Sequence, residues 1–327
     1  MSSILDVANK CKDNLKFKFP YDVADWIEKM DMMVENYHKH TTWSNLIQID
    51  SATDVNDFMR QLDSYGCKCM FSGEHGFAGE WLYIYDLCKS TKNEDNRKKM
   101  KLQNSLMFRY STEAYWVKDR NEKDRTNSHI ILVAKNYNAI RKINYILSMA
   151  SIDGFYGKPR IDLDLLFQLT KEDVFVTSAC LAGWKYEDSK EIWLDIWKHF
   201  GDSFFLEYQS HDTLKQKEIN ALISQMAQEY GIQTIIGLDT HYINDEDKIK
   251  RDNLLKRKGL VYDDEYGWYM DFPTGTELYK RMKIQNILSD EEIITSMMNT
   301  HVFVNGSENI DISTDFKIPI LEKYQNY

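Results

Sequence analysis

The sequence lacks the features that would place the protein in a membrane or direct it to secretion. Its 327 residues contain no uninterrupted apolar run of the roughly 18 residues that a transmembrane helix needs. The first segment, MSSILDVANKCKDNLKFKF, carries a charge every few positions and has no apolar stretch typical of a secretory signal. We therefore expect a soluble protein of the cytoplasm, with no membrane partner.

Proline, glycine, cysteine and basic charge are also scarce. The chain has 4 prolines and 14 glycines, with no low-complexity segment and no clear internal repeat. Its 5 cysteines are an odd, scattered set, so reduced thiols are expected rather than a disulfide framework. The net charge is −10, which disfavours sequence-independent binding to duplex DNA, because such binding needs a basic face. A metal site could still supply the local positive charge that holds one nucleic-acid end.

Short apolar runs alternate with amphipathic stretches over most of the chain. The runs are rich in Val, Ile, Phe and Tyr, and they predict strands over residues 33–38, 68–73, 106–117, 129–135, 174–179, 204–208 and 233–238. Helical periodicity is found over residues 138–150, 189–199 and 213–230. Alternating strands and helices favour a parallel sheet with helices outside it. We expect a distorted, closed or nearly closed seven-stranded α/β barrel similar to a TIM barrel.

Three regions lie outside this rhythm. Residues 1–32 are predicted to form a helical N-terminal extension before the barrel, which spans residues 33–270. Residues 271–327 are predicted to form a C-terminal appendage that begins another domain or docks elsewhere. The charged segment KSTKNEDNRKKMKLQNS, residues 89–105, is interpreted as a solvated helix or loop, with DNA contact as the alternative.

Metal-ligating residue types recur at or near the ends of the predicted strands. They are His38, His40, His75, Glu113, His129, Cys180, Asp239 and His241. In an α/β barrel, strand ends converge on one face. In an extended segment, the H-x-H and D-x-H spacings each point two side chains to one side. Imidazole, carboxylate and thiolate ligands suit Zn²⁺, Mn²⁺ or Fe²⁺, and Glu113 could bridge two ions. Clustered ions of this kind promote hydrolysis of phosphate esters.

Each of these residues also has a structural interpretation. A single histidine at a strand end more often makes a structural hydrogen bond than binds metal, and Cys180 alone would be a small buried side chain. Cys67 and Cys69 are expected to pack in the core, whereas His199 and His211 are expected on the surface. The metal interpretation therefore rests on the whole set, whose members lie at several different strands.

Several segments resemble the PHP module of bacterial and phage DNA polymerase III alpha subunits, the family of replicative DNA polymerases. YHKHTTWSN, SGEHG, STEAYWV and GLDTHY are similar to PHP motifs. DGFYGKPRIDLDLL, VTSACLAG, FFLEYQSHD and THYINDED are similar to further stretches of these polymerases. The resemblance spans about residues 34–300.

The resemblance implies a barrel that holds two or three divalent metals on the eight residues named above. It implies a 3′–5′ exonuclease of the proofreading type, acting on a DNA 3′ end, with His75, His129 and Asp239 as candidates for proton transfer. The carboxylates that polymerise DNA belong to a palm domain, so the remainder of a replicative polymerase is an expected partner. Two other hypotheses stay open: a catalytically inactive structural module of a split or truncated polymerase, and a free-standing phosphatase for small molecules.

The sequence departs from the family pattern at two positions. The family usually has an Asp seven residues after the second His of H-x-H, where this chain has Ile47. Asp50 or Asp54 would have to replace it. The Asp that usually precedes the second-motif His is Glu74. The first departure puts one metal position in question.

Overall fold

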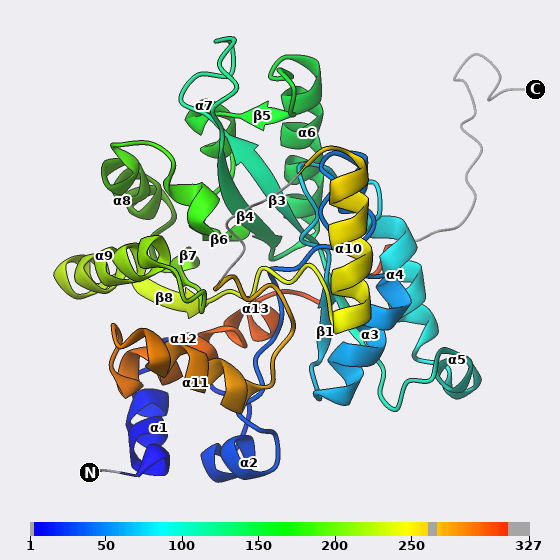
Figure 1. Cartoon of the computed structure of the whole chain (residues 1–327), viewed down its shortest axis with the longest axis vertical. Helices are drawn as coiled ribbons and strands as arrows, with labels where there is room; N and C mark the ends of the chain where they lie inside the picture. The colour runs from blue at the N-terminus through cyan, green and yellow to red at the C-terminus, as the bar shows by residue number, and fades with distance from the viewer. Residues whose placement is uncertain (1–2, 261–266, 313–327) are drawn as a thin grey trace, which may run out of the picture.

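The computed structural model describes residues 3–260 and 267–312. Its main sheet has the strand order β5-β3-β4-β6-β7-β8, and β1 and β2 form a separate parallel pair (Figure 1). The strands are β1 Cys69–Phe71, β2 Met107–Arg109, β3 Ser111–Trp116, β4 Ser128–Ala134, β5 Arg160–Ile161, β6 Val174–Thr177, β7 Phe204–Tyr208 and β8 Gln233–Ile236. The predicted α/β class is confirmed.

Helices pack around this sheet, and further helices lie beside the strand β8. The α-helices are α1 Ile4–Asp13, α2 Val23–Glu28, α3 Val55–Ser64, α4 Trp81–Ser90, α5 Glu94–Met100, α6 Tyr137–Ile152, α7 Leu163–Leu166, α8 Ser189–Phe200, α9 Leu214–Tyr230, α10 Asp245–Arg257, α11 Gly275–Gln285, α12 Asp290–Asn299 and α13 Val302–Asn305. Three 3₁₀ turns, η1 Ser44–Leu46, η2 Leu181–Trp184 and η3 Gly201–Ser203, complete the described elements. Helices α8 and α9 pack on β7, while α12 packs on β8 and α1. No helix in the described part of the chain is both long and apolar enough to cross a bilayer.

The sheet is mostly parallel, but β4 runs against both of its neighbours, β3 and β6. The purely parallel sheet expected from the alternating pattern is therefore wrong at β4. The connection from β3 to β4 contains no helix, and antiparallel neighbours need no crossover helix. This reversal places the first residues of β4 at the same end of the sheet as the last residues of β6.

The described residues do not form a closed seven-stranded barrel of continuous ladders. Residues 33–38, predicted as the first strand, are extended but unpaired, because side chains take the place of ladder partners. The Glu35 carboxylate accepts the N–H groups of Lys68 and Cys69 at 2.8 and 3.2 Å. Two isolated parallel bridges, Lys39 with Thr240 and His75 with Glu113, bring the strand ends together instead.

The predicted C-terminal appendage contributes to the same hydrophobic core as the sheet. Ile293, Ile294, Met297 and Met298 of α12 are fully buried, in the same cluster as the β8 residue Ile236. The charged segment 89–105 contains α5, which has no buried residue, as the solvated interpretation predicts. Residues 313–327 of the predicted appendage lie outside the described residues.

Candidate metal centre

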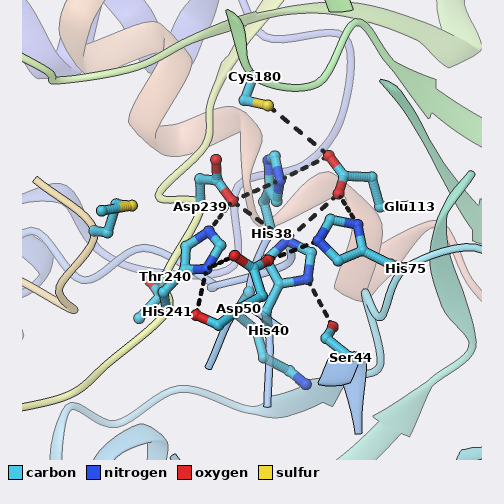
Figure 2. A network of polar contacts seen from close by, with 12 residues as sticks. His38, His40, Ser44, Asp50, His75, Glu113, Cys180, Asp239, Thr240 and His241 are labelled. Atoms are coloured by element: carbon cyan, nitrogen blue, oxygen red, sulfur yellow. Dashed lines mark hydrogen bonds and ion pairs between the residues drawn. The ribbon is translucent and has the colours of Figure 1, made fainter. Parts of the chain in front are cut away.

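The eight sequence-predicted ligand residues converge at one end of the sheet (Figure 2). The bridge between Lys39 and Thr240 sets the H-x-H and D-x-H segments side by side, with the central residue of each pair in the bridge. His129, the second residue of β4, reaches the same place only because β4 is antiparallel to β6, whose end leads to Cys180. Sheet geometry therefore gathers residues that are far apart in the sequence.

Glu113 lies at the centre of the histidines. One carboxylate oxygen is 2.8 Å from His75 Nδ1 and the other is 2.9 Å from His129 Nδ1. The same two oxygens are 3.3 Å from His38 Nε2 and 3.5 Å from His40 Nε2. Burial opposes ionisation, but the surrounding imidazoles hold the pKa of the Glu113 carboxyl well below its usual range. Its two oxygens are thus placed to bridge two cations.

Asp239 is the second carboxylate of the cluster. Its Oδ1 is 3.2 Å from His38 Nε2, 3.3 Å from His40 Nε2 and 3.0 Å from His241 Nε2. Its backbone has a positive φ of 47°, an uncommon conformation for a residue other than glycine. Strained backbone of this kind clusters at functional sites, where the surrounding structure holds it in place.

Asp50, one of the two alternatives to the position of Ile47, lies among the histidines of the cluster. Its Oδ2 is 2.7 Å from His75 Nε2 and its Oδ1 is 2.9 Å from His241 Nδ1. The Asn45 side chain folds the loop, because its Oδ1 accepts the Asp50 N–H at 2.8 Å. Asp54, the other alternative from the sequence, instead caps α3 through the N–H of Asn56. Of the two alternatives to the position of Ile47, only Asp50 therefore lies among the donors.

Cys180 closes the cluster on the side of β6. Its Sγ is 3.7 Å from His129 Nδ1 and 4.0 Å from Glu113 Oε1. Burial, together with the charges of Asp239 and Glu113, raises the pKa of the thiol well above its usual value. A nearby cation would reverse that effect, because a thiol that coordinates a metal is deprotonated.

The donor set fits divalent metal ions. Four groups of three donors have ligand atoms within 4.8 Å of one another: His38 with His40 and Asp239, His38 with Glu113 and Cys180, His40 with Asp50 and His75, and His75 with Glu113 and His129. Several buried ring atoms, including Nε2 of His38 and of His40, face the Glu113 and Asp239 carboxylates but make no well-formed hydrogen bond in the described part of the chain. Buried polar atoms are rarely left without a partner, so these atoms are available to ligate ions.

Three histidines of the cluster, His38, His75 and His241, have a pKa above the usual value for an imidazole. Burial disfavours the charged ring, but Glu113 and Asp50 raise the pKa of His75 to about 9, and Asp50 and Asp239 raise the pKa of His241 to about 10. Cationic imidazoles therefore balance the three buried carboxylates. Divalent ions can take over that role when the rings lose their protons, since only the neutral ring is a ligand.

Glu207 holds His38 through the ring nitrogen that faces away from the other donors, and it was not among the residues predicted from the sequence. Its Oε1 accepts a hydrogen bond from His38 Nδ1 at 2.7 Å, which directs Nε2 of that ring toward Glu113 and Asp239. Its Oε2 accepts from the hydroxyls of Tyr37 and Thr177 at 2.8 and 2.9 Å. Carboxylates of this type orient metal-binding histidines. A charged residue within the otherwise apolar run FFLEY was the available signal.

Glu74, the second departure from the family pattern, holds the H-x-H loop rather than joining the donors. It accepts hydrogen bonds from the N–H of Thr41 at 3.0 Å and from the hydroxyl of Ser44 at 2.5 Å. It also pairs with the fully buried Lys39 at 3.1 Å. Lys39 lies between the two histidines in sequence, so this ion pair anchors the H-x-H segment from its opposite face.

Glu80 is a buried acid next to this ion pair, and it predicts a pH-dependent stability. Its Oε1 accepts a hydrogen bond from Ser72, while its Oε2 has no partner among the residues described. Burial and the charge of Glu74 raise its pKa from 4.5 to about 8. The folded state therefore binds a proton more tightly than the unfolded state, and ionisation between these two pKa values costs stability.

We expect the Glu80→Gln variant to gain stability relative to wild type as the pH rises, by about 3–4 kcal/mol between pH 5 and pH 8. Urea unfolding at the two pH values measures the difference. The exposed Glu122→Gln variant is the control. An equal gain for Glu80→Gln at both pH values would show that the folded protein does not raise this pKa.

Other residues weighed in the sequence have different places. His211, expected on the surface, is buried. Its Nδ1 accepts the Tyr269 N–H at 3.0 Å, and its ring lies 4.5 Å from that of Trp268. His199 is half-buried and bonds the Leu169 carbonyl at 2.7 Å. Cys67 and Cys69 pack in the core, as expected.

The cluster forms the floor of a pocket of about 460 Å³. The cluster residues Asp50, His75, Glu113, His129, Cys180, Asp239 and His241 line it. Gln48, Asn127, Lys158, Leu181, Ala182, Lys185, Arg251, Trp268 and Met270 form its remaining walls. The pocket volume lies within the range of small-molecule sites, so one nucleotide-sized group can reach the donors.

Known proteins match this chain through the same region. The family model described as PHP domain matches residues 36–211, more than half of the chain. The DNA polymerase III subunit alpha of Aquifex aeolicus is 29% identical over 221 residues, which cover 64% of this chain and 18% of that protein. The corresponding subunit of Borreliella burgdorferi is 30% identical over 223 residues, covering 64% and 19%. That of Treponema pallidum is 27% identical over 233 residues, covering 68% and 19%.

The chain thus spans about a fifth of the length of these curated relatives. The family match includes most of the clustered donors, from His38 to Cys180. Motifs, geometry and comparisons agree, and the chain belongs to the PHP domain family, with DNA polymerase III alpha subunits among its relatives.

Proposed function

We propose that this chain is a metal-dependent phosphodiesterase module that removes nucleotides from DNA 3′ ends during replication. The observation that carries the proposal is the complete donor cluster at the floor of an accessible pocket, with Asp50 replacing the acid missing at Ile47. The relatives are replicative polymerase subunits, which favours DNA over a small phosphate ester as substrate. The reaction is the 3′–5′ exonuclease type used in proofreading, in the cytoplasm of a bacterial or phage-infected cell.

Two or three divalent ions, Zn, Mn or Fe, would be held by the eight predicted ligands together with Asp50. When bound, such ions activate water near neutral pH and offset the negative charge of a phosphate. Glu113 has both oxygens among the histidines and would share two ions. Glu207 keeps Nε2 of His38 directed at the site through its bond to Nδ1.

His75, His129 and Asp239 are the proposed participants in proton transfer. All three line the pocket, and the side chains of His129 and Asp239 retain 10% and 9% exposure, so they can face a substrate. A proton moved during hydrolysis needs an acceptor or donor within hydrogen-bond reach. His129 lines the pocket and contacts Glu113 through its Nδ1, so its ring would lie within reach of a group bound there.

We further propose that the bridged 38–40 segment, β1, the run of β2 and β3, and the strands β4, β6, β7 and β8 are the seven strands of the distorted barrel expected from the sequence. Residues 1–32 are then its N-terminal extension and 33–270 its body. Residues 271–327 would be the region at which the palm of a replicative polymerase, or a separately encoded polymerase chain, joins the module.

Metal content tests this function first. Protein purified without added metal should contain two or three Zn, Mn or Fe ions per chain by elemental mass spectrometry. The double variant His38→Ala/Asp239→Ala should lose them, while His199→Ala, a histidine outside the site, should keep them. In the presence of Mn²⁺, wild type should shorten a DNA primer labelled at its 3′ end. The double variant His38→Ala/Asp239→Ala should leave the primer intact. If metal-loaded wild type left the primer intact, the exonuclease proposal would be contradicted and an inactive structural module would be favoured.

A further inference from the structure

Lys158 is the one residue of the polymerase-like segment DGFYGKPRIDLDLL that lines the pocket, and the metal cluster does not use it. Its side chain is half-buried. Its Nζ donates hydrogen bonds to Gln48 Oε1 at 2.7 Å and to the Tyr115 hydroxyl at 3.1 Å. The ammonium also lies 4.6 Å from the centroid of the Tyr115 ring. Three independent contacts therefore fix its position at the pocket wall.

Both hydrogen-bond acceptors of Lys158 are neutral. Over residues 3–260 and 267–312, no carboxylate lies within ion-pair distance of its ammonium. A lysine has three N–H donors, so one remains beyond the two bonds to Gln48 and Tyr115. Removing an unpaired ammonium from water is unfavourable, and burial accordingly lowers the pKa of Lys158 to about 8. An anion in the pocket would supply the missing partner.

The two residues that hold Lys158 are themselves attached to the donor cluster. The Tyr115 ring stacks on His75 at 5.5 Å and meets His129 edge-on at 5.1 Å. Gln48 lies in the loop that delivers Asp50, two positions away. The ammonium is thus placed relative to the ligands by direct packing, with no mobile segment between them.

The rest of the segment explains how the backbone presents Lys158. Arg160 is buried and donates to the carbonyls of Gly154, Asp124 and Arg120 at 2.9, 2.6 and 2.8 Å. Pro159 packs against Gly76, where an added Cβ would lie 3.0 Å from the proline ring. These contacts lock the chain on both sides of the lysine. Lys185, exposed at the same pocket, adds a second positive charge.

We propose that Lys158 binds a non-bridging phosphate oxygen of the nucleotide that occupies the pocket, beside the metal cluster. This inference rests on the proposed function and names its ligand chemistry: a nucleoside monophosphate unit with its phosphate between the ions and the ammonium. Lysine is suited to this role as a compact point charge. It also offers an anionic substrate a local positive contact on a chain of net charge −10, because Lys158 and Lys185 both line the pocket.

Binding of thymidine 5′-monophosphate to the Mn²⁺-loaded full chain tests the assignment by isothermal titration calorimetry. Lys158→Met removes the charge but keeps an unbranched side chain of similar reach. It should weaken binding about 10- to 100-fold, as expected for one charge-assisted hydrogen bond, with metal content unchanged. Tyr115→Phe keeps the ring on His75 and removes only the hydroxyl, so a smaller loss is expected. The control is Lys118→Met, because Lys118 is paired with Asp188 outside the pocket.

The outcomes separate this inference from the exonuclease proposal. Equal affinity of wild type and Lys158→Met for the nucleotide, or no binding by wild type, would overturn the role of Lys158. Lys158-dependent binding in a protein that leaves a DNA primer intact would uphold the assignment and reject the exonuclease activity. If the primer is shortened, KM for Lys158→Met should rise more than kcat falls, because the lysine holds ground state and transition state alike.

Discussion

Replacing Asp50 with asparagine should remove at least one divalent ion and slow 3′-end hydrolysis about 100-fold or more. Loss of a residue that only supports a ligand typically costs 10- to 100-fold, so loss of a direct ligand should cost at least as much. Asparagine preserves the size of the side chain and can still accept through Oδ1. It removes the charge that faces His75 and His241 at 2.7 and 2.9 Å. Elemental mass spectrometry and single-turnover primer assays measure the two effects.

Asp54→Asn is the matched control for this variant. Asp54 is exposed and caps α3, a role that asparagine fills equally well. Metal content and rate should therefore match wild type. If Asp50→Asn kept its full metal content and rate while Asp54→Asn lost them, the carboxylate that replaces the position of Ile47 would have been identified wrongly.

Truncation after Pro273, which removes α11 to α13, should abolish cooperative folding. The four α12 residues Ile293, Ile294, Met297 and Met298 are fully buried, and each would contribute roughly 1.5–3 kcal/mol. Together they approach the whole net stability of a typical domain, about 5–15 kcal/mol. Polar anchors would also be lost, since Asn299 Nδ2 donates to the β8 carbonyl of Thr234 at 2.7 Å. Circular dichroism during heating, and solubility after expression, report the result.

Two isoleucines of the same region provide a point-mutation test with a matched control. Ile293→Ala creates a cavity in the core and should cost about 2–5 kcal/mol. Ile284→Ala changes a side chain that is 64% exposed and should stay within about 0.5 kcal/mol of wild type.

A soluble chain truncated after Pro273 that unfolds at the wild-type temperature would contradict this view and identify residues 274–312 as a separate docking segment.

The packing of α11 to α13 matters for the interpretation of the module. These helices are continuous with the core of the sheet: Phe303 of α13 packs on Tyr37 and Phe175, at ring distances of 4.9 and 5.0 Å. Tyr37 in turn bonds Glu207, the carboxylate that orients His38. A chain of contacts therefore runs from the C-terminal helices to the candidate metal centre.

Local sequence patterns predicted much of the secondary structure. Residues 204–208 and 213–230 correspond closely to β7 and α9, and Gly231 ends α9 with a positive φ of 72°. The residues that cluster at the candidate metal centre could also be selected from the sequence, because unusual residue types at strand ends are visible without any tertiary contact. Both signals depend on residues close together in the chain.

Only the tertiary structure decided which way β4 runs, which acid replaces Ile47 and what supports His38. The pairing of β4 depends on neighbours tens of residues away, and its direction carried His129 to the site. Asp50 was selected over Asp54 by a loop that Asn45 folds, and Glu207 by its position behind His38. His211 was expected on the surface and is buried, because Trp268 and Gln285, which come later in the sequence, pack against it. Residue type and spacing are properties of the chain, but direction, register and burial arise only when distant segments pack together.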